Sequence, residues 1–350
     1  MPTTSRDWQT SINTQGLMLD KKTIENLRKD LKFSDPTIFE KTVRVFSLLE
    51  SLLEFYPDLI FKGGTSILFY QFPPARLSID IDILLHEKDR AGLLGNLEAI
   101  VESSGVFKSV EEDERESAIP KAHYKFRYDP LFGPREEGIL LDVVFCEHPY
   151  HSVVKKKLKG HPLILSATNA IVNIPTPEGL FGDKITAISP KTIGLRLTEG
   201  RDMEYLKQIV DLGSLFDIVK DITDIRKTFI DTSKMENEFI KSRHLPDEIL
   251  DDITEVAFRY SQWLIKGADN SFKEIEHINK GFERLSNHLV ARLRPDDLKV
   301  AFAKVAYATQ IIRDIKVTKI IKDIDLSIVD GISFDGRYKI LDGLKKRRGA

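Results

Sequence analysis

Apolar and polar residues alternate in the segment 79–85, which predicts a β-strand with two different faces. Asp80 and Asp82 lie two positions apart on one face. The opposite face is wholly apolar (Ile79, Ile81, Ile83 and Leu85). Two neighbouring carboxylates repel each other unless a cation neutralises them. The pattern therefore predicts a half-buried strand whose polar face binds a divalent metal ion.

The segments around this strand have the periodicities of an α+β domain, with Gly and Pro residues between them. The acidic segment 111–116 is expected to be a solvated loop. We expect helices over residues 23–32, 36–56, 65–72, 89–103, 177–188 and 201–217, and strands over residues 59–61, 79–85, 122–128 and 138–146.

From residue 218 onward the chain keeps helical periodicity without strand-like alternation, which is typical of a helix bundle. Short apolar segments around 320–328 are expected to return to the core or to cap it. The chain is therefore expected to consist of a first domain over residues 1–217 and a helical domain over residues 218–350. The expected helices of the second domain cover residues 218–233, 236–242, 246–265, 272–290 and 295–315.

The composition is that of an ordinary water-soluble protein. The 350 residues are 41% hydrophobic and 30% charged, and the formal net charge of -2 gives no global attraction to nucleic acid or to anionic membranes. Cys146 is the single cysteine, which excludes an internal disulfide and a multi-cysteine zinc site. Without a signal-peptide pattern or a membrane-spanning segment, the chain is expected to be cytoplasmic and to have no membrane contact.

A Gly-Gly-Thr-Ser turn precedes the acidic strand and is a candidate phosphate site. Gly63 and Gly64 would let backbone N–H groups approach phosphate oxygens, and Thr65 and Ser66 add hydroxyl donors. The spacing matches neither a P-loop nor a G-x-G-x-x-G dinucleotide motif, and the protein-kinase motifs are absent. Four basic residues are candidate charge partners for the phosphates: Lys62, Arg76, Lys184 and Lys207.

A third acid, Asp142, interrupts the otherwise apolar strand expected over residues 138–146. Pairing with Arg or Lys would be a structural explanation, but its position after an Asp-x-Asp strand favours function. Asp80, Asp82 and Asp142 could together hold one or two Mg²⁺ ions, or Mn²⁺ in their place. Two-metal phosphoryl transfer uses such a cluster, with the ions ~3.5–4 Å apart.

Each of these features taken singly has an ordinary explanation. A Gly-Gly turn is usually only a turn, Asp-x-Asp occurs by chance, and Lys207 with Asp211 is a surface i,i+4 pair. The order in which the phosphate turn, the acidic strand and the lone later acid follow one another is much harder to obtain without a function.

Residues 62–83, KGGTSILFYQFPPARLSIDIDI, resemble the GG-T/S-x-L…R-x-S-x-DID stretch of the AbiEii/AbiGii abortive-infection toxin family, in the DNA polymerase β-like nucleotidyltransferase superfamily. PEGLFGDKITAI and LKQIVDL resemble the family's Lys-bearing helix and K-x-x-x-D element. The resemblance covers about residues 59–215. It implies a nucleotidyltransferase fold, a mixed twisted sheet flanked by helices, and metal-dependent transfer of a nucleotide from an NTP to an acceptor. It also implies a toxin of a toxin–antitoxin system in antiviral defence, with a cognate antitoxin and tRNA 3′ ends as the first acceptor to test.

The resemblance also implies roles for individual residues. Asp80 and Asp82 would hold the metal, Lys184 and Lys207 would bind phosphate, and Asp211 would orient these lysines or the acceptor. By analogy with the superfamily's third carboxylate, Asp142 is the expected general base. The nucleotide would be held by the remaining motif residues: Lys62, Gly63, Gly64, Thr65, Ser66, Arg76 and Ser78.

Several points stay open from the sequence. Many relatives carry Lys-Asp where this chain has Lys207-Gln208, so the remaining acid could be Asp142, Asp202 or Asp211. The lysine-rich segment 155–159 is either a solvated turn or a path for RNA. Two other functions compete with the transferase: a GTP-binding or other nucleotide-binding regulatory module without transfer activity, and an interaction protein whose helical half docks a partner.

Overall fold

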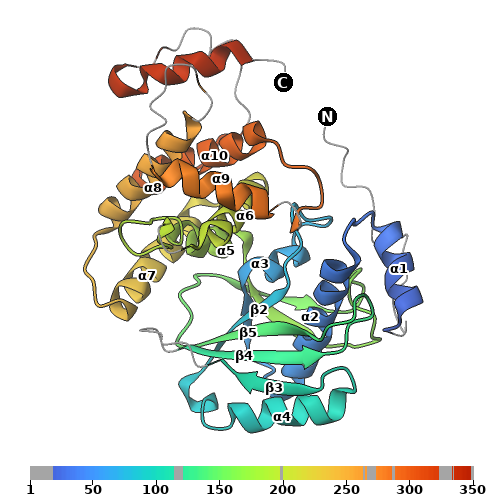
Figure 1. Ribbon diagram of the computed structural model, residues 1–350. Coiled ribbons are helices and arrows are strands. Elements are labelled where there is room, and N and C mark those ends of the chain that lie inside the picture. The colour runs from blue at the N-terminus through green and yellow to red at the C-terminus, as the bar shows by residue number, and fades with distance from the viewer. Residues whose placement is uncertain are drawn as a thin grey trace. The chain divides into compact units, whose positions relative to one another are not determined.

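The computed structural model describes residues 19–113, 121–197, 200–262, 265, 273–285, 288–322, 333 and 335–347. The chain divides into two compact units, one ending at Thr176 and the other beginning at Pro177. Among the described residues, all strands belong to the first unit, whereas the second consists of helices and their connections (Figure 1).

The first unit is built on a mixed seven-stranded sheet with the order β3-β4-β5-β2-β1-β7-β6. β2 pairs antiparallel with β1 and parallel with β5, and β1 pairs parallel with β7. This sheet, flanked by helices, confirms the expected α+β class. The strands are β1 (Ile60–Lys62), β2 (Asp80–Leu85), β3 (Ser109–Glu112), β4 (Lys121–Tyr128), β5 (Glu137–Phe145), β6 (Val153–Lys157) and β7 (Ile171–Pro175).

Three of these strands were not expected from the sequence. β3 ends within the acidic segment 111–116, which was expected to be a solvated loop, and that expectation is wrong for Glu111 and Glu112. Glu111 pairs across the strands with Lys125, and its carboxylate lies 3.0 Å from the Arg127 guanidinium. Cross-strand charge pairing with β4 therefore outweighs the local polar composition. β6 and β7 also escaped prediction, since both are short and β6 is rich in lysine.

The helices of the first unit flank the sheet, and α2 packs against β2 and β5. α2 begins sharply because the Asp35 carboxylate accepts hydrogen bonds from the backbone N–H groups of Thr37 and Ile38. The helix expected over residues 65–72 is instead a single α-turn followed by a 3₁₀ turn. The helices are α1 (Lys21–Asp30), α2 (Pro36–Phe55), α3 (Gly63–Ser66) and α4 (Leu93–Ser104), with 3₁₀ turns η2 (Ile67–Phe69) and η3 (Glu87–Asp89).

A buried histidine, His161, ties the segment after the glycine turn to the core. Its ring centre lies 4.8 Å from that of Phe46 and 4.9 Å from that of Phe69. Nε2 lies 3.2 Å from the Leu68 carbonyl oxygen, to which it donates, and Nδ1 accepts from the Leu163 N–H. Burial lowers the pKa of His161 to about 4. The imidazole is therefore neutral in the folded protein near neutral pH.

The depressed pKa of His161 predicts a pH-dependent stability. The unfolded chain takes up a proton near pH 6.5 and the folded chain only near pH 4. The stability contributed by the neutral ring is therefore complete above pH 6.5 and is lost as the pH falls towards 4, by about 3 kcal/mol. Urea unfolding at pH 7 and pH 4.5 measures it. The variant His161→Gln should lose less stability over this interval, and an equal loss would contradict the assignment.

The second unit is a set of packed helices. α5 packs against α7, α6 against α9 and α10, and α8 against α10. A Cβ at Gly182 would come within 2.8 Å of the Ile225 carbonyl oxygen, so α5 and α7 touch along their backbones. The helices are α5 (Pro177–Thr186), α6 (Asp202–Ile218), α7 (Ile222–Phe239), α8 (Pro246–Ser261), α9 (Lys273–Leu285) and α10 (Pro295–Arg313), with a 3₁₀ segment η6 (Gly336–Arg347).

The boundary between the compact units differs from the expected division into residues 1–217 and 218–350. α5 and α6 were assigned to the first domain, but their packing partners α7, α9 and α10 lie in the second unit. The helix expected over residues 236–242 is mostly the end of α7. Of the segment 320–328, residues 320–322 have no regular structure and the rest lies outside the described residues. No described helix combines the length and apolar character needed to cross a membrane.

Candidate active site

Three acids share one face of the sheet because of its register. Asp82 on β2 pairs with Asp142 on the parallel strand β5. Asp80 precedes Asp82 by two residues and therefore points to the same side. Asp80 and Asp82 are both partly exposed. The apolar residues that alternate with them, Ile81 and Ile83, are fully buried. The parallel pairing thus unites two carboxylates from one strand with a third that is distant in sequence.

The same row continues across two further strands. Lys62 on β1 lies opposite Asp82, and His123 on β4 lies opposite Asp142. His123 Nδ1 lies 2.7 Å from Asp142 Oδ1. We call the four residues Lys62, Asp82, Asp142 and His123 the cross-strand row. Acidic residues occupy its centre and residues able to donate hydrogen bonds occupy its two ends.

The glycine turn lies directly against the acidic strand. Gly63 has a φ of +76°, and a Cβ built on it would come within 1.9 Å of Asp82 Oδ2. A Cβ on Gly64 would come within 2.3 Å of an Arg76 guanidinium nitrogen and 3.0 Å of the Ser78 hydroxyl. Arg76 and Ser78 are both buried. The turn, a carboxylate and a guanidinium are therefore in contact, and only glycine leaves room for them.

The hydroxyls of Thr65 and Ser66 donate to backbone carbonyl oxygens of β2 and of the turn. Thr65 Oγ1 donates to the Asp80 carbonyl oxygen at 2.6 Å, and Ser66 Oγ donates to the Gly63 carbonyl oxygen at 2.9 Å. Both residues are fully buried. The sequence predicted that these hydroxyls donate to a triphosphate; here the Thr65 hydrogen bond joins the turn to β2, and the Ser66 hydrogen bond lies within the turn. These two buried hydrogen bonds hold the backbone of the turn in place.

A methyl group at Gly63 is expected to disrupt this site. Gly63→Ala should destabilise the chain by at least about 2 kcal/mol, from the left-handed backbone together with the collision against Asp82. Misplacing the carboxylate by about 1 Å should lower nucleotide transfer about 10²-fold. Gly105→Ala is the matched control, because Gly105 has a φ of +60° and open space around it. Urea unfolding and a transfer assay measure both, and equal effects of the two variants would contradict the proposed contact.

The acids fit a metal bound together with a nucleotide better than a metal held by protein alone. Among the described residues, no group of three or more His, Cys, Asp and Glu side chains is arranged to hold a metal ion. Asp80, Asp82 and Asp142, which the sequence predicted could hold one or two Mg²⁺ ions, are not arranged as a ready-made metal cluster in the structure, and one oxygen of Asp142 bonds to His123. Mg²⁺ usually binds one or two carboxylates and takes its other ligands from water and substrate phosphates. Asp80 and Asp82 beside the glycine turn suit that mode.

The second unit holds a buried ion pair made of two other predicted residues. Lys184 Nζ on α5 lies 3.0 Å from Asp211 Oδ2 on α6, and each side chain is only 6% exposed. Lys184 also donates to Gln208 Oε1 at 3.0 Å. Lys207, one helical turn before Asp211, is partly exposed. Lys184 thus has a charged partner, Asp211, and a neutral partner, Gln208. Gln208 stands at the position where the motif resemblance would place an acid.

Two of the three candidates for the remaining acid are buried and paired with a basic side chain. Asp202, at the start of α6, is buried, and its Oδ1 lies 3.0 Å from Nδ1 of His277 on α9. Asp211 is bound to Lys184. Asp142 keeps 37% of its side chain exposed. Of the three acids that the sequence left open, Asp142 is therefore the one whose carboxylate is most accessible.

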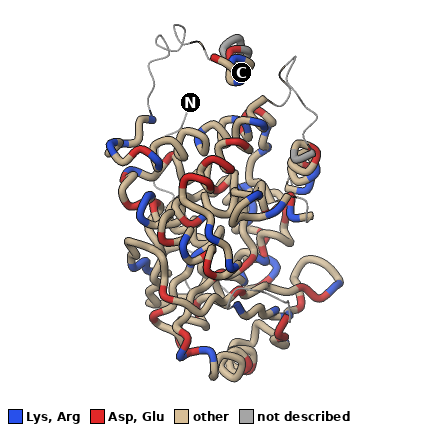
Figure 2. The backbone as a smooth tube through the Cα atoms, turned by 90° about the vertical axis from the view of Figure 1, so that its left-hand side faces the viewer, with Lys and Arg blue, Asp and Glu red and all other residues tan. Residues whose placement is uncertain are grey.

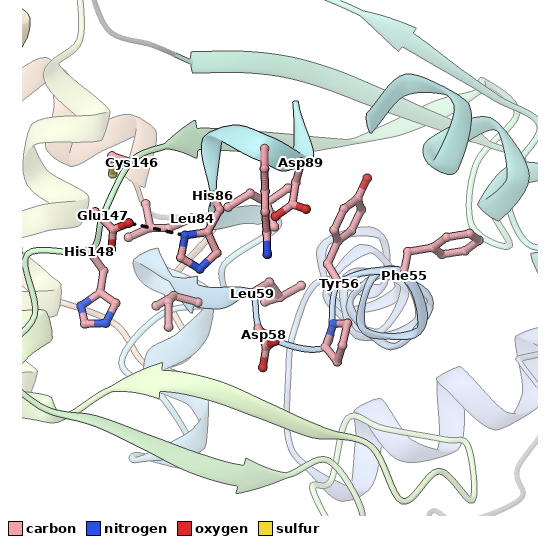
Figure 3. Close-up of a pocket in the computed structure, with 14 residues that line it drawn as sticks. Phe55, Tyr56, Asp58, Leu59, Leu84, His86, Asp89, Cys146, Glu147 and His148 are labelled. Carbon is pink, nitrogen blue, oxygen red and sulfur yellow. Dashed lines mark ion pairs between the residues drawn. The ribbon is translucent and has the colours of Figure 1, made fainter. Parts of the chain in front are cut away.

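A pocket of about 370 Å³ lies at the other end of β2 (Figure 3). It is lined by Leu85 at the end of β2 and by Leu59 just before β1, whereas Asp80 stands at the beginning of β2. In it His86 Nδ1 lies 3.6 Å from Glu147 Oε1. Its lining includes the three acids Asp58, Asp89 and Glu147 and one lysine, Lys88, so the pocket favours no strongly anionic ligand.

His123 is the site residue that sequence reasoning missed. It stands in the segment KAHYKFRY, where alternate polar positions resemble an ordinary exposed strand face. The available signal was the hairpin register, because pairing Tyr128 with Glu137 across the loop places His123 opposite Asp142. Without the loop geometry, a shift of one residue would have placed the imidazole on the other face.

A mixed sheet flanked by helices, with paired acids beside a glycine turn, is the arrangement that the resemblance to nucleotidyltransferases implied. A family model described as nucleotidyl transferase AbiEii toxin, type IV toxin–antitoxin system, matches residues 47–303. The chain belongs to the AbiEii toxin family, which confirms the resemblance noted from the motifs. It is accordingly a nucleotidyltransferase toxin of the type IV toxin–antitoxin class.

Several solved structures are similar to the chain at low sequence identity. MenT4, a nucleotidyltransferase toxin from Mycobacterium tuberculosis, has 11% identity and a TM-score of 0.44, covering 83% of this chain and 99% of that one. JHP933 from Helicobacter pylori has 14% identity and a TM-score of 0.43, covering 78% and 92%. An antigenic nucleotidyltransferase-like protein from Paracoccidioides brasiliensis has 17% identity and a TM-score of 0.34, covering 51% and 77%. No curated protein matches the chain.

Proposed function

We propose that the chain transfers a nucleotide from an NTP, bound with Mg²⁺, to the 3′ end of an RNA, with tRNA as the first acceptor to test. The observation that supports this best is the contact between the Gly63 turn and the Asp82 carboxylate. A turn that lets backbone N–H groups reach phosphate, placed against a metal-binding acid, suits a metal–triphosphate complex. The cognate antitoxin remains a partner implied by the family.

Each site residue has a proposed role. Asp80 and Asp82 hold the cation, which when bound would neutralise phosphate charge and polarise the reacting oxygens. Gly63 and Gly64 offer backbone N–H donors, and Arg76 behind Gly64 adds positive charge. Ser78, Thr65, Ser66 and Lys62 support this turn and its strand. Lys184, held by Asp211, and Lys207 are proposed to balance phosphate charge.

In the proposed reaction one P–O bond forms, another breaks, and one proton is transferred. The acceptor hydroxyl oxygen attacks the α-phosphorus, forming a new P–O bond. The bond between the α-phosphorus and the α–β bridging oxygen breaks, and pyrophosphate leaves. Asp142 takes up the hydroxyl proton, because its second oxygen is not the one bonded to His123.

Incubating the chain with each of the four α-labelled NTPs, Mg²⁺ and total tRNA tests this function. We expect label in RNA and release of pyrophosphate with at least one nucleotide. Absence of label with all four, or label transfer that survives the double variant Asp80→Asn with Asp82→Asn, would overturn the mechanism. NTP binding without pyrophosphate release would instead support the regulatory nucleotide-binding module.

The edge strand β6 is the proposed path for the RNA backbone. Figure 2 shows basic and acidic residues interspersed along the chain. Attraction of an RNA backbone therefore has to come from a local run of lysines. Lys155 and Lys157 on β6, and Lys159 after it, are exposed. Lysines on an edge strand also discourage sheet-to-sheet association, so their presence alone does not establish RNA binding.

Replacing Lys155 and Lys157 with glutamine is expected to flatten the salt dependence of RNA binding. Each lost phosphate contact should reduce the slope of log K against log salt by about 0.7 for single-stranded RNA. Binding titrations at several salt concentrations measure this slope. Lys22 and Lys29, exposed on α1, provide a control pair whose replacement should leave it unchanged. An unaltered slope for the β6 variant would remove the proposed path.

A further inference from the structure

We infer that His148 stacks against the nucleobase of the NTP and is therefore part of the nucleotide site. This inference rests on the proposed function, in which the Gly63 turn and the paired acids hold the triphosphate and its cation. His148 lies outside the motifs that carry the family resemblance. Its assignment comes from an aromatic contact and from the register of β1 with β2.

His148 is an exposed ring on a buried aromatic support. Its ring centre lies 6.1 Å from that of Tyr150, with 23° between the ring planes, which is the geometry of an offset stack. Tyr150 is only 4% exposed, whereas His148 is exposed. The imidazole is therefore held by the interior and still presents ring surface to solvent.

Tyr150 connects this stack to the acidic side of the sheet. Lys62 Nζ lies 5.9 Å from the centre of the Tyr150 ring. Lys62 lies opposite Asp82 in the pairing of β1 with β2, so its side chain points to the side of the sheet that carries the acids. The stack of Tyr150 and His148 therefore begins beside one end of the cross-strand row.

The strand register places His148 near the acids by a second route. Ile60 pairs with Leu84, and these two residues face the same side as Lys62 and Asp82, from which they are two positions away along their strands. Ile60 and Leu84 line a pocket together with His148 (Figure 3). Two positions along a strand span about 7 Å. His148 thus lies within the length of a nucleotide whose phosphates are bound at Asp82.

The order of the cross-strand row favours the base of the NTP over a base of the acceptor. Lys62, next to the stack, leads directly into the Gly63 turn that is proposed to bind the triphosphate. Asp142, which is proposed to take up the proton of the acceptor hydroxyl, lies on the other side of Asp82. The base attached to the triphosphate therefore comes closer to His148.

Stacking on His148 should add affinity without choosing strongly among the four bases. Nucleobases stack on aromatic side chains, histidine included. Every base offers such a face, so the contact tolerates different bases. We therefore expect His148 to raise the affinity for whichever NTP the chain uses.

Calorimetric titration of the full chain with Mg²⁺ tests this role by comparing two probes. One is the NTP that binds tightest among the four, and the other is inorganic tripolyphosphate, which carries the phosphates without a base. His148→Ala should weaken NTP binding about 5- to 150-fold, the range for loss of one base–aromatic stack, and leave tripolyphosphate binding unchanged. His148→Phe, which keeps an aromatic ring, should retain most of the NTP affinity, and His148→Leu should not.

His151→Ala is the matched control, because His151 is exposed on the same connection between β5 and β6. It should leave both affinities unchanged. Equal losses for the NTP and tripolyphosphate in His148→Ala, or equal NTP affinities of the phenylalanine and leucine variants, would overturn the inference. A purely structural histidine would lower the unfolding temperature and affect both probes alike.

The outcomes also distinguish this inference from the proposed function. If RNA is labelled and His148→Ala leaves the KM for the NTP unchanged, only the role of His148 falls. A rise in the KM for tRNA alone would assign the ring to the acceptor and overturn the inference as well. If the His148 pattern holds but no NTP labels RNA, the nucleotide site stands and the transferase proposal fails. If the unaltered chain binds no NTP, both are overturned.

Discussion

Asp82→Asn is expected to lower nucleotide transfer on the order of 10³-fold, the largest loss of activity for any single substitution. Asparagine keeps the size of the side chain and one of its oxygens but removes the charge. Asp82 is the acid that touches the Gly63 turn and pairs with Asp142 in the parallel ladder. Because Asp82 lies against the turn and beside the third acid, its charge acts on both parts of the proposed site.

Asp82→Asn should not lose stability although it loses activity. Removing one of three neighbouring negative charges relieves repulsion, so the variant should unfold at the same temperature as the unaltered chain or higher. Asp89→Asn, in the pocket at the far end of β2, is the control and should leave transfer unchanged. Retained transfer in Asp82→Asn, measured with labelled NTP, would refute the assignment of this site.

Asp211→Asn is expected to have the second large effect, on both stability and activity. Lys184 and Asp211 are almost fully buried, and the substitution removes the carboxylate charge beside the ammonium while the neutral Gln208 stays. Removing one member of a buried ion pair costs about 3–5 kcal/mol. Urea unfolding should show this loss, and transfer should fall because Lys184 is no longer held in place.

A double variant separates these two contributions. Lys184→Met combined with Asp211→Leu replaces the pair with apolar side chains of similar size, which is often neutral or stabilising for buried ion pairs. It should recover most of the stability lost in Asp211→Asn and remain inactive in the labelled-NTP assay. A double variant that is both stable and active would show that the pair is structural and that Lys184 binds no phosphate.

The sequence predicted the strand that carries Asp80 and Asp82 well because its signals are local. The alternation at residues 79–85 assigns the buried and polar faces of β2 without knowledge of its neighbours. The glycine turn is likewise recognisable from residues that follow one another. Gly63 has a φ of +76°, a backbone conformation that glycine adopts readily. Local patterns of this kind survive into the structure because the backbone itself imposes them.

Features that depend on pairing between distant segments could not be predicted from the sequence. β3, β6 and β7 are strands because of what they pair with, since their own composition includes exposed Glu and Lys. The bond between His123 and Asp142 needs the β4–β5 register, and the hydroxyl bonds of Thr65 and Ser66 need the fold of the turn. The division at Thr176 needs the packing of α5 and α6, which their own periodicity does not reveal.

The parallel pairing of β2 with β5 also determines when the site can assemble as the chain is made. β3, α4 and β4 lie between these strands in sequence, and β5 inserts between β4 and β2 in space. Such non-local pairing forms late, because a long loop must close first. A nascent chain or fragment that ends before β5 carries Asp80 and Asp82 without Asp142. For a toxin, interrupted translation would therefore release a product that lacks the complete set of acids.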